Sequence, residues 1–376
     1  MSTAAPAEPP RPAVIGDVAL LAGVSRQTVS RVLNGSGSVS AEARRRVQDA
    51  VVRLGYEPDA SARALGARRR SSAGRVVPAA PTGGVVERVA PVARHVLVTG
   101  GSGKLGRAVV AQLVEDGDRV SVVDLAHPGR DDVAWTRADL TDYGQAVGVL
   151  TGVDDRWGRP DAVVHLAALP APGLRPDATT FAANVTTTYN VFSACRVAGV
   201  DTVVWASSET VLGLPFDVPP PYLPLDEGCG PAPTTSYSLS KTLEEEMARQ
   251  FARWRPELSI TGLRFSNVME PADYAAFPGF DADPAGRRWN AWAYVDARDG
   301  ARAVTAALAA RLPGAELFVV ANDDTVMGRP SAELAAGWFP GVPVRGQVSG
   351  HRALMSSARA QRLLGWVPRH SWRDEV

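Results

Sequence analysis

Two residues four positions apart, Tyr237 and Lys241, have the types and the spacing of a proton-transfer pair. Positions i and i+4 share one face of a helix, so the phenol and the ammonium would be neighbours there. A free tyrosine has a pKa of about 10, and a nearby cation is needed before it can act as a base at neutral pH. Only two of the 40 basic residues are lysine, Lys104 and Lys241. The pattern predicts an acid–base pair, and the alternative is an ordinary exposed pair on a helix.

Two serines, Ser207 and Ser208, follow an apolar run that predicts a strand over residues 202–206. A hydroxyl at the end of this strand can meet a substrate oxygen beside Tyr237. With Lys241, these side chains have the composition of a site that moves a proton to or from an alcohol or carbonyl.

A glycine-rich loop, Thr99 to Gly106, follows a predicted strand over residues 95–99 and opens an amphipathic helix. Its glycines let the backbone turn tightly and approach a pyrophosphate held at the helix N-terminus. The next predicted strand, residues 119–123, is followed by Asp124, 18 residues beyond Gly106. A carboxylate there can accept bonds from both hydroxyls of an adenosine ribose and would repel a 2′-phosphate. The sequence therefore predicts a dinucleotide site that prefers NAD.

NADP is not excluded, because Arg107 and Arg130 lie near enough in sequence to hold a 2′-phosphate. Asp139 is expected near the adenine, although a carboxylate at a helix N-terminus would explain it too. His165 is expected beside the cofactor or, equally, in the core. The predicted cofactor-binding residues around the loop are Gly100, Gly103, Lys104, Leu105, Gly106, Asp124, Asp139, Leu140 and Ala167.

The elements that position these residues alternate between strand and helix from residue 95 onward, with a further predicted strand over residues 162–166. Such alternation is typical of the α/β class, with a parallel, doubly wound sheet. We expect a Rossmann domain with a small C-terminal substrate part, mainly from residue 264 onward, preceded by a small all-α domain.

The first 90 residues differ in charge from the rest. They hold 13 arginines and no lysine against seven acidic residues, a net charge of +6 that leaves −6 for the remainder. This asymmetry predicts a polyanion as the partner of the N-terminal part.

A helical pattern between Ile15 and Leu54 is broken at residues 23–25 and 34–37, which predicts three short helices. Side chains on the second helix can read base edges or grip phosphates in a major groove. The alternative is a helical bundle whose arginines are only solvated. The outward residues of that helix are Arg26, Gln27, Ser30 and Arg31.

This region resembles the DNA-binding domain of the lactose-repressor (LacI) family over residues 14 to 67. The segments that carry the resemblance are residues 23–25, 28–34, 39–40, 54–56 and 58–65. It implies a helix-turn-helix dimer on a palindromic operator in double-stranded DNA, with Leu65 of a hinge helix wedged into the minor groove. The implied DNA contacts are Arg26, Gln27, Thr28, Ser30, Arg31 and Leu65.

Residues 95 to 370 resemble the extended short-chain dehydrogenase/reductase family, which includes NAD-dependent sugar epimerases, dehydratases and uronate dehydrogenases. The resemblance implies that Ser208 orients the substrate, Tyr237 is the general acid/base, and Lys241 binds the nicotinamide ribose and lowers the tyrosine pKa. It implies dimerisation through helices near residues 179–198 and 237–254. It adds Asn184, Tyr237 and Lys241 to the cofactor contacts, and implies Ser208, Glu209, Asn267 and Arg287 as substrate contacts.

The residues immediately after the serines restrict the set of reactions that the site is expected to catalyse. Sugar dehydratases of this family have a consecutive Asp–Glu pair, whereas this chain has Glu209 and Thr210, which counts against dehydration. Three arginines, Arg264, Arg287 and Arg288, can clamp a carboxylate bidentately or form structural ion pairs, and both interpretations stay open.

The predicted organisation is a tail (1–13), a DNA-binding domain (14–67), a linker (68–93) and a reductase domain (94–376). Two cysteines exclude a disulfide framework and a cysteine metal site. No signal peptide and no run of about 18 apolar residues is present. We therefore expect a cytoplasmic protein with no metal and no membrane contact.

Two functions fit these features. The first is an NAD(P)-dependent oxidoreductase or epimerase of a sugar or sugar acid that also binds DNA. The second is a LacI-type transcription regulator whose reductase domain senses NAD(H) or a sugar with little or no turnover.

Overall fold

The computed structural model describes residues 15–24, 28–29, 32, 40–54, 93–152 and 157–376. The chain divides into two compact units, residues 1–89 and 90–376, and each has its own apolar core.

In the first unit, α1 (Ile15–Ala22) and α3 (Ala41–Leu54) pack against each other. α1 ends before Gly23, whose φ of +62° costs a glycine little. Ser40 precedes α3, and its hydroxyl accepts a hydrogen bond from the Ala43 amide at 3.3 Å, as is typical of a helix N-cap. The buried side chains are Val18, Ala19, Ala22, Val29, Val32, Val47 and Ala50.

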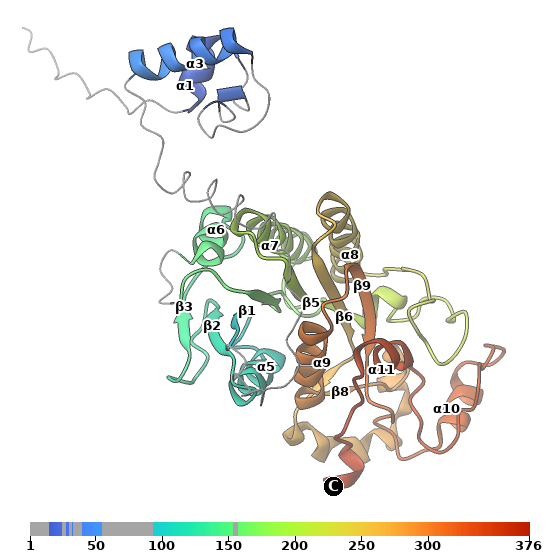
Figure 1. Cartoon of the computed structure of the whole chain (residues 1–376). Helices are drawn as coiled ribbons and strands as arrows, with labels where there is room; N and C mark the ends of the chain where they lie inside the picture. Colours follow the sequence, from blue (N-terminus) through green and yellow to red (C-terminus); the bar gives the residue numbers. More distant parts are fainter. Residues whose placement is uncertain (1–14, 25–27, 30–31, 33–39, 55–92, 153–156) are drawn as a thin grey trace, which may run out of the picture. The chain divides into compact units, whose positions relative to one another are not determined.

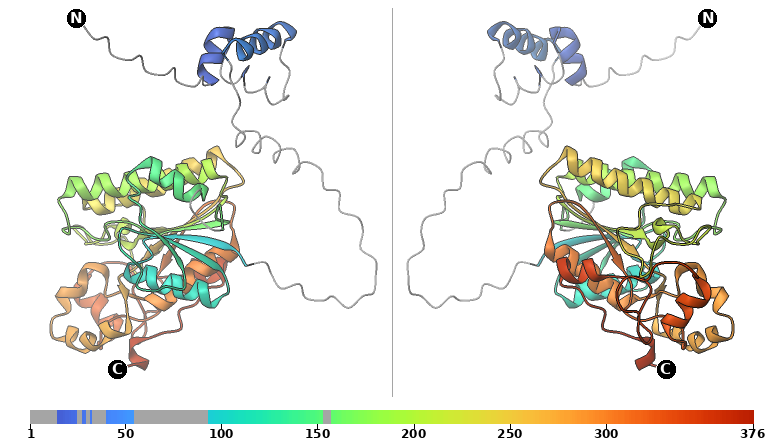
Figure 2. Two further views of the ribbon diagram at one scale, coloured as in Figure 1. Left: turned by 90° about the vertical axis from the view of Figure 1, so that its left-hand side faces the viewer. Right: turned by 90° about the vertical axis from the view of Figure 1, so that its right-hand side faces the viewer.

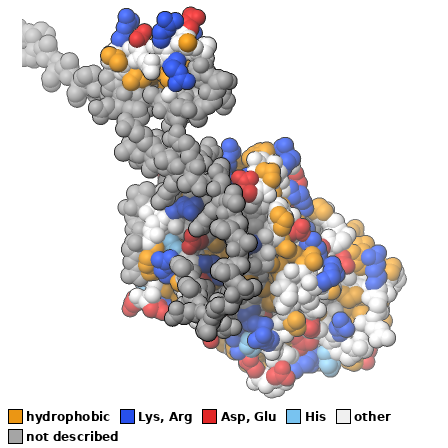
Figure 3. Space-filling model, in the orientation of Figure 1, with side chains coloured by type: hydrophobic (Ala, Val, Ile, Leu, Met, Phe, Trp, Pro, Cys, Tyr) orange, Lys and Arg blue, Asp and Glu red, His pale blue; other side chains and the backbone are white. Residues whose placement is uncertain are grey.

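Most of the predicted second helix lies outside the described residues. Thr28, Val29 and Val32 are helical, and the two valines face the core. Basic side chains stand out on the described part of this unit (Figure 3). The other predicted DNA contacts, Arg26, Gln27, Ser30, Arg31 and Leu65, lie outside the described residues.

The second unit is built on a seven-stranded parallel sheet in the order β3-β2-β1-β4-β5-β6-β9 (Figure 1). The predicted α/β class is thereby confirmed. The strands are β1 (His95–Thr99), β2 (Arg119–Val123), β3 (Ala134–Thr136), β4 (Ala162–His165), β5 (Thr202–Ser208), β6 (Ser259–Phe265) and β9 (Gly314–Val320). Most of their residues are buried, because helices cover both faces.

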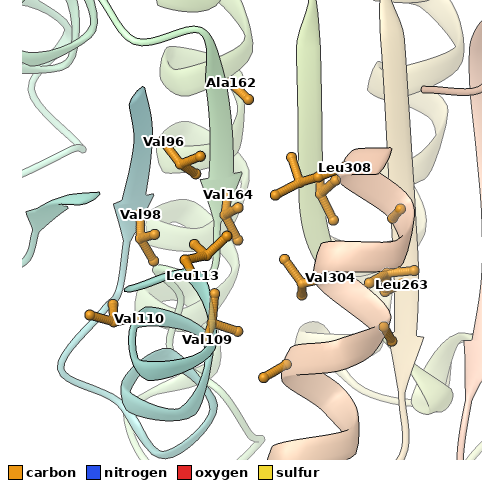
Figure 4. Packing of buried hydrophobic residues seen from close by; sticks show 14 of the residues in the cluster. Val96, Val98, Val109, Val110, Leu113, Ala162, Val164, Leu263, Val304 and Leu308 are labelled. Carbon is orange, nitrogen blue, oxygen red and sulfur yellow. The ribbon is translucent and has the colours of Figure 1, made fainter. Parts of the chain in front are cut away.

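Helices form a layer on each side of the sheet, as Figure 2 shows from two directions. One layer holds α5 (Lys104–Glu115) and α9 (Ala297–Ala310); the other holds α6 (Tyr143–Thr151), α7 (Asp177–Ala198) and α8 (Ser236–Trp254). Figure 4 shows part of the first core, where Val96, Val98 and Val164 of the sheet meet Val109 and Leu113 of α5. The second core lies beneath α6, α7 and α8.

A third apolar cluster includes Trp292, Tyr294, Phe277 and Leu354, together with residues before 264 such as Leu214. The remaining elements of the second unit are η1 (Glu209–Leu212), β7 (Val268–Met269), η2 (Pro271–Ala282), η3 (Pro284–Asn290), β8 (Val295–Asp296), α10 (Ser331–Trp338), α11 (Ala358–Leu364) and η4 (Trp372–Asp374).

The strand order reverses between β1 and β4, because β1 has β2 on one side and β4 on the other. Ligands of open α/β sheets bind at the carboxyl ends of the strands at such a switch point. The glycine loop after β1, Asp124 after β2 and the serines ending β5 all lie on that edge.

Candidate active site

Ser208 is the last residue of β5 and caps the short helix η1. Its Oγ accepts bonds from the Thr210 amide at 3.2 Å and the Thr210 hydroxyl at 2.9 Å. Ser207 points to a different partner, since its hydroxyl donates to Glu245 Oε1 at 2.7 Å. Ser208 is thus the serine that faces Tyr237.

α8 carries Tyr237 and Lys241 and packs against β5. Thr235 and Ser238 form a reciprocal capping box that fixes the first turn of α8. Tyr237 lies in that turn and Lys241 one turn later, and both side chains are buried. The pair is therefore not an exposed helix pair.

Burial raises the pKa of Tyr237, while the Lys241 charge and the Ser208 hydroxyl lower it in part. The expected lowering by Lys241 is present, but desolvation outweighs it because a buried phenolate loses its hydration. In the absence of ligand, the phenol is the prevailing form at neutral pH.

Lys241 is anchored by two acceptors. Its Nζ donates to Ala206 O at 3.0 Å and to Glu244 Oε2 at 2.9 Å. Burial lowers the pKa of Lys241, but the charges of Glu244 and Tyr237 outweigh that effect and raise it. The ammonium therefore stays charged beside Tyr237.

The glycine loop fits the close approach of a dinucleotide backbone. A Cβ at Gly100 would lie 2.6 Å from Ala167 N, and one at Gly106 would lie 2.1 Å from Gly100 O. Side chains at these positions would fill the turn that packs helix α5 against the sheet. Gly103 stands just before α5, at the helix terminus that suits a phosphate.

Asp124 lies at this loop, because its two carboxylate oxygens accept from Ser102 N at 3.0 Å and Ala126 N at 3.1 Å. A carboxylate has further lone pairs for ribose hydroxyls. The two arginines that favour NADP both have partners, and Arg107 lies at the same loop because its Nη1 donates to Ser102 O at 3.1 Å. Arg107 binds Glu270 at 2.9 Å, and Arg130 binds Asp132 at 2.5 Å.

The remaining predicted cofactor residues have definite partners. Lys104 Nζ lies 2.6 Å from Asp273 Oδ2. Asp139 accepts from Thr141, and the capping carboxylate of α6 is that of Asp142. Asn184 binds the backbone of Leu169 through both ends of its amide, at 2.8 and 3.1 Å. Leu105 and Ala167 pack at the margins of the two cores, whereas Leu140 is buried.

His165 is a core residue that links two hydroxyls. Its Nδ1 lies 2.7 Å from the Thr99 hydroxyl and its Nε2 lies 3.2 Å from the Thr188 hydroxyl. Burial, with a contribution from Lys241, lowers the pKa of His165 to about 3. The ring is therefore neutral throughout the physiological range.

A second polar cluster follows η1. Glu209 is buried, and its carboxylate accepts from Ser266 Oγ at 2.6 Å and Asn290 Nδ2 at 3.2 Å. Burial raises the pKa of Glu209 to about 7, against the opposing effects of those two partners and of Arg287. The Glu209 carboxylate is thus held by neighbouring side chains of this cluster.

Arg287 meets neutral oxygens. In the amide orientation that satisfies both side chains, Asn267 Oδ1 accepts from Nη1 at 2.8 Å and Nη2 at 3.2 Å. Nη2 also lies 3.3 Å from Ala293 O, and Nε has no hydrogen-bond partner among the described residues. Burial lowers the pKa of Arg287, and Glu209 partly offsets this.

The other two arginines differ from Arg287. Arg264 forms a bidentate ion pair with Glu245, through bonds of 2.8 and 2.7 Å, so the structural interpretation holds for it. Arg288 stacks on Phe339, with 5.3 Å from Cζ to the ring centroid. Within the part of the chain that the structure describes, neither Arg287 nor Arg288 has a carboxylate within 4.0 Å.

Three residues of the site were missed from the sequence: Glu244, Glu245 and Asn290. Successive helix residues turn by about 100°, so a run of three glutamates at 244–246 cannot all face water on a packed helix. That run was the available signal. Asn290 gave no signal, because its contact with Glu209 spans 81 positions.

Comparison with known proteins places both units in families. Residues 96–283 match the NAD dependent epimerase/dehydratase family, and residues 14–59 match the bacterial regulatory proteins, lacI family. The chain belongs to the NAD dependent epimerase/dehydratase family and carries a LacI-type N-terminal domain.

Individual relatives agree. UDP-glucose 4-epimerase of Erwinia amylovora is 31% identical over 186 residues, covering 46% of this chain and 52% of that protein. L-arabinose 1-dehydrogenase (NAD(P)(+)) of Haloferax volcanii is 27% identical over 257 residues, and the match covers 65% of this chain and 96% of that protein. The chain spans about half the length of the first UDP-glucose 4-epimerases that it matches.

Solved structures share the fold. A short-chain dehydrogenase/reductase superfamily protein from Agrobacterium tumefaciens with bound NAD has a TM-score of 0.58 at 23% identity, covering 75% of this chain and 94% of that chain. A UDP-galactose 4-epimerase has a TM-score of 0.55 at 27% identity, and the match covers 75% of this chain and 95% of that chain.

None of the helices in the described residues is long and apolar enough to cross a membrane.

Proposed function

We propose that the second unit is an NAD-dependent oxidoreductase or epimerase of a sugar or sugar acid, and that the first unit binds a specific DNA sequence. The observation that carries the catalytic part is the buried set of Ser208, Tyr237 and Lys241 beside the glycine loop. Family membership and the names of the NAD-bound relatives support NAD as the cofactor.

Bound NAD would accept the hydride, and residues of the chain would bind the NAD and transfer the proton. Gly100 and Gly106 allow the tight turn of the loop at which the pyrophosphate would bind, Asp124 would hold the adenosine ribose, and Lys241 the nicotinamide ribose. The residues present fit this cofactor, because the loop excludes a Cβ and the carboxylate has lone pairs to spare.

Ser208 would orient the substrate oxygen for proton exchange with Tyr237. In the reducing direction the Tyr237 phenol would donate its proton, and in the oxidising direction the Tyr237 phenolate would take one from the alcohol. Because burial keeps the phenol protonated at neutral pH, the reducing direction needs no prior change of protonation state.

Arg287 supports a sugar acid as the substrate. Its half-buried guanidinium has only neutral oxygens as hydrogen-bond partners among the described residues, stacks on Phe280 and Trp289, and keeps an unpartnered Nε. Such a group is suited to a carboxylate, which forms charge-assisted hydrogen bonds with arginine. The test is a screen of neutral sugars and sugar acids with NAD and NADP, following the absorbance of the reduced cofactor. We expect NAD reduction with a sugar acid; no turnover with any substrate, together with no binding of NAD, would overturn the proposal.

DNA binding is supported by the LacI family match and by the positive charge of the first 90 residues. Dimerisation would let two heads engage a palindrome. α7 and α8 carry apolar side chains that are 39–52% exposed, and these support the predicted dimer: Tyr189, Val197, Leu239, Leu243 and Trp254. Leu243→Glu should then yield a monomer in sedimentation, and a variant that remains dimeric would remove this surface from the proposal.

The alternative of a sensing regulator is favoured by the same LacI match. It predicts that operator affinity changes when NADH or substrate is added. If operator affinity is equal with and without both ligands, the sensing interpretation is wrong and only the enzyme interpretation remains.

A further inference from the structure

Glu244 is a buried carboxylate beside the lysine of the proposed catalytic set. Its side chain is 0% exposed, and its Oε2 lies 2.9 Å from Lys241 Nζ, one turn earlier on α8. The neighbouring glutamates behave differently: Glu245 pairs with Arg264, whereas the side chain of Glu246 is half exposed and pairs with Arg249. Of these three glutamates, Glu244 is the one that forms an ion pair with a member of the catalytic set.

Glu244 also limits how Lys241 can bind a ligand. An ammonium has three N–H donors, and two of those of Lys241 are directed to Ala206 O and Glu244 Oε2. One donor is left for a ribose hydroxyl or the tyrosine oxygen. The ammonium is therefore held in one orientation before any ligand arrives.

We propose that Glu244 is a positioning residue, which fixes the Lys241 ammonium in place and offsets part of its positive charge at Tyr237. The effect on turnover rests on the proposed function, whereas the effect on Tyr237 does not.

The charges that face this pair come from every element packed around it. Lys241 favours the phenolate of Tyr237, whereas Glu244 and Glu209 disfavour it. Glu245 disfavours ionisation of Glu244, but its own charge is shared with Arg264 of β6. His165 of β4 is neutral.

The ion pair with the Lys241 ammonium, 2.9 Å away, favours the ionised state of Glu244. Burial raises the pKa of Glu244, and Lys241 and the Thr188 hydroxyl of α7 offset only part of that rise. Replacing the carboxylate by the amide of glutamine keeps the size of the side chain and removes one negative charge. The field of Lys241 at Tyr237 then acts without that offset, so the pKa of Tyr237 must fall.

The experiment is a tyrosinate absorbance titration of the full-length protein without ligand. Subtracting the curve of a Tyr237→Phe background from each variant isolates Tyr237 among the seven tyrosines. We expect Glu244→Gln to move its midpoint down by about one pH unit. Glu244→Asp, which keeps the charge, should restore most of the wild-type midpoint, and Glu246→Gln, on the exposed face, should leave it unchanged.

Turnover supplies an independent reading. In Glu244→Gln the acid limb of the oxidation rate should move to lower pH by a similar amount, with thermal melting as the check on folding. An unchanged midpoint in a folded Glu244→Gln protein would overturn this inference. Absence of turnover in the wild type would instead overturn the proposed function and leave the titration result standing.

Discussion

In two regions of the site the cations have opposite kinds of partner, and Lys241 and Arg264 are buried whereas Arg287 is half-buried. On the α8 side, Lys241 and Arg264 each meet a carboxylate, from Glu244 and Glu245, within 2.9 Å. On the η3 side, Arg287 is partnered by an amide oxygen and a backbone carbonyl. A buried charge without a counter-charge is costly unless something else compensates.

The difference distinguishes structural from ligand-directed cations. The Glu245 carboxylate already pairs with Arg264, so Arg264 has no room for an anionic ligand. By contrast, the Nε of Arg287 has no hydrogen-bond partner among the described residues. The lowered pKa of Arg287, caused by burial, agrees with incomplete compensation. Of the three arginines that looked equivalent in the sequence, Arg264 is thus set apart by its ion pair with Glu245, whereas Arg287 and Arg288 both keep an unpartnered Nε among the described residues.

The largest expected effect concerns the paired region. Tyr237→Phe removes the proton-transferring hydroxyl and should lower turnover by about 10²–10⁴-fold, measured as NADH formation at saturating substrate. Operator affinity should not change, because the DNA-binding residues belong to a separate unit. Wild-type turnover in this variant would contradict the assignment of Tyr237.

Breaking a structural ion pair should cost stability. Glu245→Gln leaves the Arg264 guanidinium buried without a counter-charge and should lower the free energy of unfolding by about 3 kcal/mol, measured by urea denaturation. Arg287→Met is the matched control and should change it by less than about 1 kcal/mol. Equal losses in the two variants would erase the distinction between the regions.

Arg287→Met should instead affect binding. Loss of a charge-assisted contact raises KM for a carboxylate-bearing substrate by about 10–100-fold, and for a neutral sugar only a few-fold. Arg288→Met, which loses stacking on Phe339, serves as the control in the same assay. A similar rise for acidic and neutral substrates would show that Arg287 does not read the carboxylate.

The smallest effect is a pH dependence of stability at Glu209. Burial raises its pKa from 4.5 to about 7, so the folded state binds the proton more tightly than the unfolded state does. This contribution to stability is present at low pH and is lost as the pH rises between those values, by about 2 kcal/mol from pH 5 to 7. Glu209→Gln, which imitates the neutral acid, should flatten the profile of melting temperature against pH. An unchanged profile would place the pKa of Glu209 outside this range.

Much of the second unit could be predicted from local patterns. The strands at 95–99 and 119–123 were predicted with the observed bounds, and β4 and β5 differ from prediction only at their ends. Apolar strand runs, the glycine loop and the i,i+4 spacing of Tyr237 and Lys241 are short-range features, so the residues alone carry them. The boundaries of α1 and α3 could be predicted from the sequence for the same reason.

The partners of charged side chains were decided by the tertiary structure. Arg264 and Glu245 are 19 positions apart, and Glu209 and Asn290 are 81 apart. Helix packing buries Glu244 and leaves Glu246 at the surface, although the sequence gives both the same side chain. The sequence by itself determined the fold class, and it predicted the dinucleotide loop and the proton-transfer pair. Which cations are neutralised and which stays open to a ligand depends on long-range contacts, because burial and counter-charge are properties of the packed molecule.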